Sequence, residues 1–344
     1  MSDKPSIIAK SNHDFTYKVS LARTALKLGL EELGANPNQI LLVPDYCCDV
    51  ILHPLDQLGL KILYYEVSDE LSPNWDQLDK IDISNVFGIL MIHYFGEPQN
   101  IKKFQDYCRK KEIYLIEDNA HGYGGKYKGK WLGTFGDIGI SSPRKILRTS
   151  HGGILYLLNQ PIIINPDCSL KRIPFLEVVV NLLKLIVYRC QPLYDYILVQ
   201  KLKKIDFSDP YEFRERQQKD TKLSIFEKYI IKNAKIKDIA KKRRKLWFRW
   251  KEYLSNQGLR PVFTRISEHS CPWLIAFYCD DISQRNFWIK WGMNNGFPLF
   301  SWPCLSDYQI KKQGSAFKRW EKIICVALDD KPPTTRVQIA NDAN

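Results

Sequence analysis

The stretch that decides the fold reads Ile113-Tyr114-Leu115-Ile116-Glu117-Asp118-Asn119-Ala120-His121. It leads to Ser141-Ser142-Pro143-Arg144-Lys145, in which Lys145 lies 27 residues after Asp118. An apolar run of β-strand character ends in the acid, and a second short run ends in two hydroxyls and the lysine. Short buried strands of this kind are typical of a parallel sheet that is covered on both faces. Because ligands bind at the carboxyl ends of such strands, we expect Asp118 and Lys145 to face one site.

Short apolar strands alternate with helical segments over the first part of the chain. Strands are predicted at 40–43, 61–65, 86–92 and 113–116, and helices at 22–33, 48–58 and 100–111. This alternation predicts an α/β fold in which a mainly parallel sheet is covered by helices. Tyr46, His93 and Asp118 then fall at the carboxyl ends of strands.

An acid and a lysine at the ends of neighbouring strands are the groups that a pyridoxal phosphate (PLP) site needs. The acid pairs with the pyridinium nitrogen, and the lysine forms a Schiff base with the cofactor. The lysine must lose its proton to attack a carbonyl, which burial and a neighbouring cation such as Arg144 favour. A buried unpaired carboxylate is costly, so an acid that closes an apolar strand is seldom core filler. The alternatives are a surface lysine and an aspartate that caps a helix or forms a salt bridge.

The order of these motifs resembles the DegT/DnrJ/EryC1/StrS aminotransferases, which are fold-type-I PLP enzymes. The resemblance covers about residues 17–157. Besides the acid and the lysine, it is carried by Leu21-Ala22-Arg23-Thr24-Ala25-Leu26, Pro44-Asp45-Tyr46-Cys47-Cys48, His93-Tyr94-Phe95-Gly96, Lys126-Tyr127-Lys128-Gly129-Lys130 and Gly136-Asp137-Ile138-Gly139.

The resemblance implies catalytic roles for Lys145, Asp118 and His121. Lys145 is the residue that carries the cofactor and moves the proton, and Asp118 pairs with the pyridinium. His121 lies near the cofactor's phenolic oxygen, where a ring N–H would stabilise the phenolate. A partly buried histidine bonded to the backbone is the alternative for His121.

The resemblance also implies how the rest of the cofactor is bound. Tyr46 stacks on the ring, although a core aromatic is the alternative. Hydroxyls and N–H groups at a helix start suit the phosphate. We expect this end to be formed by Ala22, Arg23 and Thr24 together with one of the two serines Ser141 and Ser142.

Several positions depart from the family pattern, and they affect the expected substrate half of the site more than the cofactor half. The spacing from Gly136-Asp137 to Lys145 is about two residues shorter than the commonest version. His151 stands where many relatives have an acid before Gly-Gly, and the C-terminal pattern survives only as Val326-Ala327-Leu328-Asp329. Trp302-Pro303-Cys304-Leu305 does resemble the family's "Trp-Pro-x-Leu".

The function implied by the resemblance is amination of a nucleotide-linked keto-sugar for surface polysaccharide or O-antigen lipopolysaccharide biosynthesis, with glutamate as the amino donor. The expected enzyme is a homodimer. In the family's dehydratases a histidine replaces the lysine, so Lys145 favours amination. The alternative is a catalytically eroded member that acts as a binding or regulatory module through the basic residues 222–251.

Composition sets further limits on the chain of 344 residues. Nine cysteines without a Cys-x-x-Cys pair argue against a structural zinc site, and the odd count with no secretory leader favours the cytoplasm. The net charge is +13, and residues 222–251 hold twelve Lys/Arg against two acids. Because their apolar residues recur at helical spacing, we favour a solvated helix face and expect no nucleic-acid partner.

The domain organisation is predicted from the change in pattern after residue 158. Residues 1–205 form a PLP-binding large domain with a helical extension at 173–205, and residues 206–344 form the basic helical region and a smaller α/β C-terminal domain. Ile173–Val187 is the most apolar segment, but Glu177 and Lys184 interrupt it. For this segment we favour a buried interdomain helix or a dimer surface over peripheral contact with a membrane.

Overall fold

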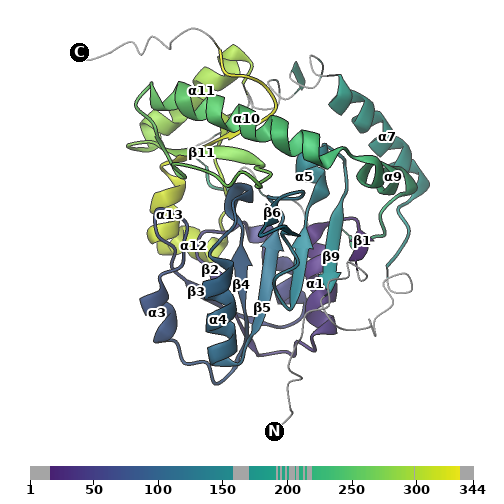
Figure 1. The fold of residues 1–344 in the computed structure, drawn as a ribbon, viewed down its shortest axis with the longest axis vertical. Coiled ribbons are helices and arrows are strands. Elements are labelled where there is room, and N and C mark those ends of the chain that lie inside the picture. The colour runs from purple at the N-terminus through teal and green to yellow at the C-terminus, as the bar shows by residue number, and fades with distance from the viewer. Residues whose placement is uncertain are drawn as a thin grey trace.

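The protein is described by a computed structural model that covers residues 16–157, 170–190, 219–297 and 299–333, with 193, 196–197, 200, 206, 209–211 and 214 between them. Two sheets organise these residues (Figure 1). A seven-stranded sheet belongs to the first part of the chain, and a four-stranded sheet belongs to the last part. The domain limits at 205 and 206 stay a prediction.

The seven-stranded sheet is mainly parallel. Its strands lie in the order β1 (Thr16–Val19), β9 (Gly153–Leu157), β8 (Ile138–Ser141), β5 (Tyr114–Asn119), β4 (Val86–Ile92), β2 (Ile40–Pro44) and β3 (Lys61–Tyr65). The pairs from β8 across to β3 are parallel, whereas β9 pairs antiparallel with both β8 and β1. Every residue of β4 is buried, as expected for a central strand with both faces covered. The predicted α/β fold is confirmed.

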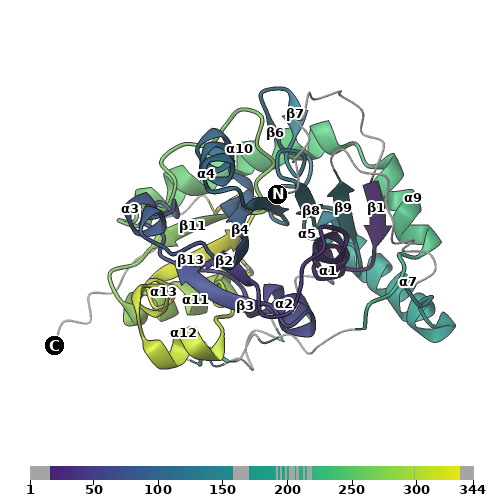
Figure 2. The same cartoon turned by 90° about the horizontal axis from the view of Figure 1, so that it is seen from below.

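Helices cover both faces of this sheet. In Figure 2, α1 (Ala22–Glu32) and α2 (His53–Gln57) lie on one side of the strands and α4 (Ile101–Lys111) lies on the other. The shorter elements are α3 (Trp75–Asp79), α5 (Pro143–Leu147), the 3₁₀ turns η1 (Asp49–Ile51) and η2 (Tyr94–Gly96), and the hairpin of β6 (Lys126–Tyr127) and β7 (Lys130–Trp131).

The helix predicted over 48–58 is wrong as a single element. The structure divides it into η1 and α2, and Leu52 lies between them. Pro54 stands in the first turn of α2, where its missing N–H is tolerated but would interrupt a helix running through from residue 48.

The four-stranded sheet is antiparallel throughout. It consists of β10 (Arg260–Pro261), β11 (Leu274–Tyr278), β13 (Ile323–Ala327) and β12 (Leu299–Phe300) in that order. Successive side chains alternate between its faces. Ile275 and Phe277 pack in one core cluster with Trp250 and Trp288, from α10 (Ile236–Ser255) and α11 (Ile282–Asn295). Leu274 and Ala276 belong to the core of the first sheet, so the two sheets share a continuous apolar contact.

Two helices at the other edge of the molecule, α7 (Phe175–Arg189) and α9 (Ile225–Asn233), lie near β9 and β1 in Figures 1 and 2. The extension predicted over 173–205 is helical as far as Arg189, and most of 191–205 lies outside the described residues. The buried interdomain helix is wrong, because Leu176, Leu183 and Ile186 are 74%, 58% and 65% exposed. No helix in the described ranges is long and apolar enough to cross a membrane.

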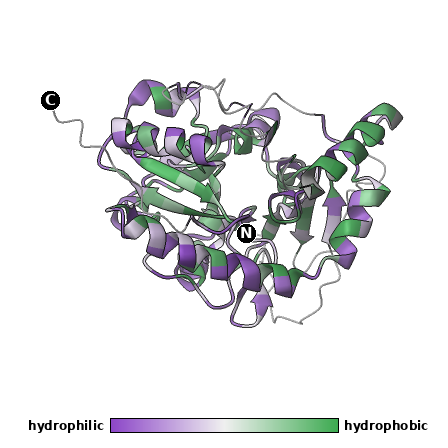
Figure 3. Cartoon of the chain, turned by 90° about the horizontal axis from the view of Figure 1, so that it is seen from above, coloured by the Kyte–Doolittle hydropathy of each residue, from purple (hydrophilic) through white to green (hydrophobic). Residues whose placement is uncertain are grey.

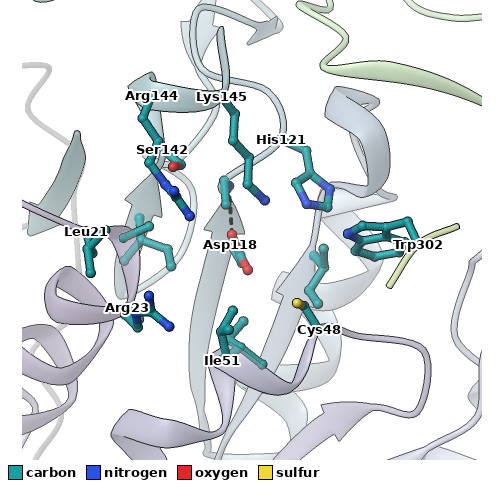
Figure 4. A pocket seen from close by; sticks show the side chains of 15 residues that line it. Leu21, Arg23, Cys48, Ile51, Asp118, His121, Ser142, Arg144, Lys145 and Trp302 are labelled. Atoms are coloured by element: carbon teal, nitrogen blue, oxygen red, sulfur yellow. Dashed lines mark hydrogen bonds between the residues drawn. The ribbon is translucent and has the colours of Figure 1, made fainter. Parts of the chain in front are cut away.

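The last two helices, α12 (Asp307–Lys312) and α13 (Ser315–Trp320), precede β13. Ala316 and Trp320 of α13 are buried in the same core cluster as Leu274 and Ala276. Residues 301–306 connect β12 to α12 and carry Trp302 toward the carboxyl ends of the parallel strands (Figure 4). This connection is how the last part of the chain reaches the candidate site.

Candidate active site

A cavity lies at the carboxyl ends of β4, β5 and β8, beside the start of α1 (Figure 4). Most of its wall comes from residues before 150, and Trp302 is the contribution of the last part of the chain. The lining residues are Leu21, Ala22, Arg23, Cys48, Val50, Ile51, Ile92, Asp118, Ala120, His121, Ile140, Ser142, Arg144, Lys145 and Trp302.

Asp118 lies at the floor of the cavity near the end of β5. One carboxylate oxygen accepts a hydrogen bond of 2.7 Å from the Ala120 N–H, which fixes the side chain in place. Burial raises the pKa of the Asp118 carboxyl, and the nearby charge of Lys145 opposes that shift. A buried carboxylate in this position gains most from a cationic partner in the cavity.

His121 is the neutral hydrogen-bond donor of the site. Its Nδ1 accepts a hydrogen bond of 3.2 Å from the Phe95 N–H, so the proton of the neutral ring is on Nε2. Burial, with the charge of Lys145, holds the pKa of His121 well below its usual value of 6.5. The ring packs between Trp302, at 5.1 Å between centroids, and Trp273, at 4.7 Å. His121 therefore offers one N–H in a fixed orientation.

Lys145 projects from α5 toward Asp118 and His121 (Figure 4). Its Nζ lies 4.3 Å from the centroid of the Trp273 ring, so an aromatic face supports the amine. The helix that carries Lys145 ends at Leu147 and is capped by Arg148, which is in the left-handed conformation with φ of 53°. Arg148 Nη2 lies 2.7 Å from Asp329 Oδ1, and Arg243 also contacts this carboxylate at 3.4 Å.

Cationic and hydroxyl groups gather at the opposite end of the cavity. Figure 4 shows Arg23, Ser142 and Arg144 on this side, together with Leu21. Leu21 caps α1 without a side-chain hydrogen bond, so the first N–H groups of that helix face the cavity end. Backbone N–H groups, a hydroxyl and two guanidinium groups are the donors that a phosphate group takes.

The start of α1 is held by two distant segments of the chain. The Gly152 N–H donates to the Ser20 carbonyl at 2.7 Å, and the Ser20 N–H donates to the Thr221 carbonyl at 3.0 Å. A Cβ at Gly153 would lie 2.3 Å from the Leu21 carbonyl carbon, so only glycine allows this approach. The Gly-Gly pair therefore positions the helix start that borders the cavity.

Glu117 supports the site from beneath, fully buried. One carboxylate oxygen lies 2.8 Å from His93 Nε2 and accepts from the Gly133 N–H at 2.6 Å, and the other accepts from the N–H groups of Phe135, at 2.6 Å, and Gly136, at 3.1 Å. His93 is itself fully buried and does not line the cavity. This pair fixes the loop between β7 and β8 against β5.

Six of the nine residues predicted for the site line this one cavity. They are Ala22, Arg23, Asp118, His121, Ser142 and Lys145. Ser141 instead bonds to the Asn119 side-chain amide at 3.0 Å, and the Thr24 hydroxyl donates to Asp220 at 2.6 Å. Between the two serines, the position of Ser142 favours it as the phosphate ligand. The roles of all nine stay predictions.

Tyr46 does not line the cavity. Its ring is fully buried, and its hydroxyl donates to the Trp302 carbonyl. Because Tyr46 secures Trp302 from behind, the residues that reach the cavity from this side are Trp302 and Cys48. The prediction that Tyr46 stacks on a cofactor ring gains no support from this position.

Sequence reasoning missed Trp302 and Cys48 as parts of the wall. Trp302 packs edge-on against Tyr46, Phe95 and His121 at centroid distances of 5.4, 5.2 and 5.1 Å. The "Trp-Pro" motif marked Trp302 in the sequence, but it did not predict that the ring would lie in the cavity wall. Cys48 is half-buried beside the cavity.

The donor set fits pyridoxal phosphate. A buried carboxylate, a neutral N–H donor and an amine converge at one end of the cavity, and phosphate-type donors converge at the other. Asp118 and His121 would hold the ring edge, Lys145 would form the covalent link, and Ser142 with Arg23 would hold the phosphate. Bound there, the cofactor would supply an electron sink beside the Lys145 amine.

The sheet order and the cavity at the strand ends define the fold of the fold-type-I PLP enzymes. The chain superposes on the aminotransferase TlmJ from Streptoalloteichus hindustanus with a TM-score of 0.64, 19% identity, and coverage of 91% of this chain and 80% of that one. It also matches E. coli GDP-4-keto-6-deoxy-D-mannose-3-dehydratase with bound hydrated PLP, with a TM-score of 0.63, 16% identity, and coverage of 92% and 83%. The model of the DegT/DnrJ/EryC1/StrS aminotransferase family matches residues 7–165, which include Asp118 and Lys145.

Similarity in sequence to a curated relative covers less than half of the chain. GDP-perosamine synthase from Escherichia coli O157:H7 is 28% identical over 155 residues, which span 43% of this chain and 42% of that enzyme. The match therefore covers less than half the length of this curated relative. It supports the interpretation of the chain as an enzyme rather than as a binding module that acts through residues 222–251.

Proposed function

We propose that the protein is a PLP-dependent aminotransferase that transfers an amino group, with glutamate as donor, to a nucleotide-linked keto-sugar for surface polysaccharide biosynthesis. The single observation that carries the proposal is the convergence of Asp118, His121 and Lys145 in one cavity within the part of the chain that belongs to the aminotransferase family. A homodimer in the cytoplasm is part of the proposal.

Each residue has a distinct task in this reaction. The Asp118 carboxylate keeps a ring nitrogen protonated, and the His121 Nε2–H donates to the ring oxygen without adding a charge. The Lys145 amine takes a proton from the donor's α-carbon and returns one to the carbon that is aminated. Trp302 and Ile51 close the cavity with apolar surface, which limits water beside the reacting amine.

Lys145→Ala tests the cofactor half. The full chain is incubated with PLP and reduced with borohydride, and the labelled peptide is located by mass spectrometry. We expect the label on Lys145 in the parent protein, none in Lys145→Ala, and loss of turnover by about a thousandfold or more. Lys130→Ala is the matched control, because Lys130 is exposed on β7 and should leave labelling unchanged. Labelling that survives in Lys145→Ala would overturn the assignment.

A second measurement tests the transfer itself. The PLP-loaded protein is mixed with glutamate, and 2-oxoglutarate is quantified before any sugar is added. One equivalent per site is expected from an amino-transfer half-reaction. Release of ammonia with a GDP- or dTDP-linked keto-sugar, without an aminated product, would instead indicate dehydration, the reaction named for the E. coli enzyme of the same fold.

A further inference from the structure

The helices α7 and α9 share one polar contact on their inner sides. His151 Nδ1 lies 3.2 Å from the Asn181 side-chain nitrogen on α7 and 3.4 Å from Glu227 Oε1 on α9. All three side chains are buried. Because both helices point these polar groups at the same histidine, their opposite sides both face away from the body of the protein.

The outer side of α7 is apolar. A helix turns about 100° per residue, so Val179 and Leu183, two positions on either side of Asn181, point almost opposite to it. The exposed apolar side chains form one arc along the helix and comprise Leu176 (74% exposed), Val179 (37%), Val180 (40%), Leu183 (58%) and Ile186 (65%). Figure 3 shows α7 in green at the edge of the molecule.

The outer side of α9 repeats this arrangement. Ile225 and Tyr229 lie two positions on either side of Glu227, and they are 81% and 68% exposed. Phe226 adds a third exposed apolar side chain at 47%. We call the exposed apolar residues of the two helices the α7–α9 face. An apolar surface of this extent on a soluble fold marks an interaction site.

Basic side chains border the α7–α9 face. Residues 170–190 and 222–238 contain nine Lys/Arg and three acids, and one of these acids, Glu227, is buried. Lys228 and Lys232 lie on α9 next to its apolar arc, and Lys184 lies beside the arc of α7. The face therefore combines apolar side chains with positive charge at its rim.

We propose that the α7–α9 face binds the surface of an anionic lipid bilayer. Two short helices would lie in the interface plane, with the apolar arcs in the acyl boundary and the lysines at the anionic headgroups. A second copy of the chain fits the face less well, because a two-fold interface would bring its lysine rim close to the same rim of the partner. The 15 residues of α7 are too few to span a bilayer.

Vesicle co-sedimentation of the full chain tests the proposal. Vesicles of phosphatidylcholine and phosphatidylglycerol in equal parts are compared with phosphatidylcholine alone. We expect binding to the anionic vesicles that weakens as salt is raised, and little binding to the neutral ones. The test needs neither PLP nor turnover, so its outcome is separate from that of the proposed function.

Two variants assign the binding to the face. Leu183→Gln/Ile186→Gln should lower the partition onto anionic vesicles by at least about tenfold, since each apolar side chain loses its favourable burial. Lys228→Gln/Lys232→Gln should lower it by about tenfold through lost charge. The matched controls are Leu63→Gln, an exposed leucine on β3, and Lys311→Gln/Lys312→Gln on α12, and both should bind as the parent does.

Three results would overturn the proposal. In the first, the full chain stays in the supernatant with every vesicle. In the second, both variants of the face, Leu183→Gln/Ile186→Gln and Lys228→Gln/Lys232→Gln, bind anionic vesicles as tightly as the parent. The third is a size-exclusion and light-scattering measurement in which Leu183→Gln/Ile186→Gln turns a dimer into a monomer. That result would assign the α7–α9 face to a contact between copies.

Discussion

The first part of the chain, residues 16–157, and the last part, residues 236–333, contribute differently to the cavity. Among the residues that the structure describes, the first part supplies all the titratable groups that line it, from Arg23 to Lys145. The last part supplies one wall residue, Trp302, and supports Lys145 from outside through Trp273. The first sheet therefore positions the reactive side chains of the cavity. How well the cavity is closed depends on the packing of the second sheet against the first.

This difference explains where the sequence has diverged. The motifs that match the family end near residue 165, where the sheet that holds Asp118 and Lys145 is complete. An apolar wall can be built from many sequences, provided that its volume and shape are kept. Few other residues can replace a carboxylate or a lysine together with the hydrogen bonds that support it. Substitutions inside the first sheet should therefore cost more than substitutions at the junction with the second.

The largest effect is expected inside the first sheet, at Glu117. In Glu117→Gln, one of the two acceptor oxygens is replaced by an NH₂ group that faces backbone N–H donors. We expect a loss of about 3 kcal/mol in the free energy of unfolding, measured by denaturant titration. Glu66→Gln, at an exposed position, should change it little. A Glu117→Gln variant as stable as the parent would contradict the expectation that substitutions inside the first sheet cost more than substitutions at the junction.

A smaller effect is expected at the junction, at Asp329. Asp329→Asn removes the charge that pairs with Arg148, three residues after Lys145, and with Arg243. The variant should lose about 2 kcal/mol of stability and bind PLP more weakly. The exposed ion pair of Lys102 with Asp106 is the control, and Asp106→Asn should change the free energy of unfolding little. Equal losses in the two variants would contradict a structural role for the Arg148 contact.

The smallest effect is expected at Glu97, also at the junction, where both carboxylate oxygens accept from the Ser267 N–H at 3.0 Å. Burial raises the pKa of Glu97 from 4.5 to about 7. Folding therefore favours the protonated carboxyl, and the stability that it contributes falls as the pH rises from 4.5 to 7. Glu97→Gln lacks this titration, so its stability relative to the parent should increase over that window by on the order of 1 kcal/mol.

The measurement for Glu97 is the difference in free energy of unfolding between variant and parent at several pH values from 4 to 8. Groups that titrate equally in both proteins cancel in this difference. A difference that stays flat with pH would show that the Glu97 carboxyl is already ionised at pH 5, and that the junction tolerates the charge.

Prediction from the sequence worked best for strands and helices that are determined by their local sequence. The strands at 61–65 and 86–92 were predicted with the limits that the structure has. Asp118 and Lys145 reach one cavity because parallel strands bring their carboxyl ends to a common edge, which is a rule of topology. Once the alternation of strands and helices had indicated a parallel sheet, the positions of these two groups followed.

The same reasoning failed where side-chain direction and distant packing decide. A residue at a strand end can point into the site or behind it, and Tyr46 points behind it to hold Trp302. Trp302 is 157 residues after Lys145, so no local pattern places its ring in the cavity wall. The division of the 48–58 helix depended on Pro54, whose position in a first turn was not recognised.

The hydrogen bonds of Ser20 with Gly152 and Thr221 impose an order on the protein's assembly during synthesis. Residues 20–23 are made well before the backbone partners that hold them, which follow some 130 and 200 residues later. A chain still emerging from the ribosome can pair β2, β3, β4 and β5, but it cannot fix the start of α1. The end of the cavity proposed to bind the cofactor phosphate is therefore completed only after residue 221 has left the ribosome. A nascent chain shorter than that has no finished site there.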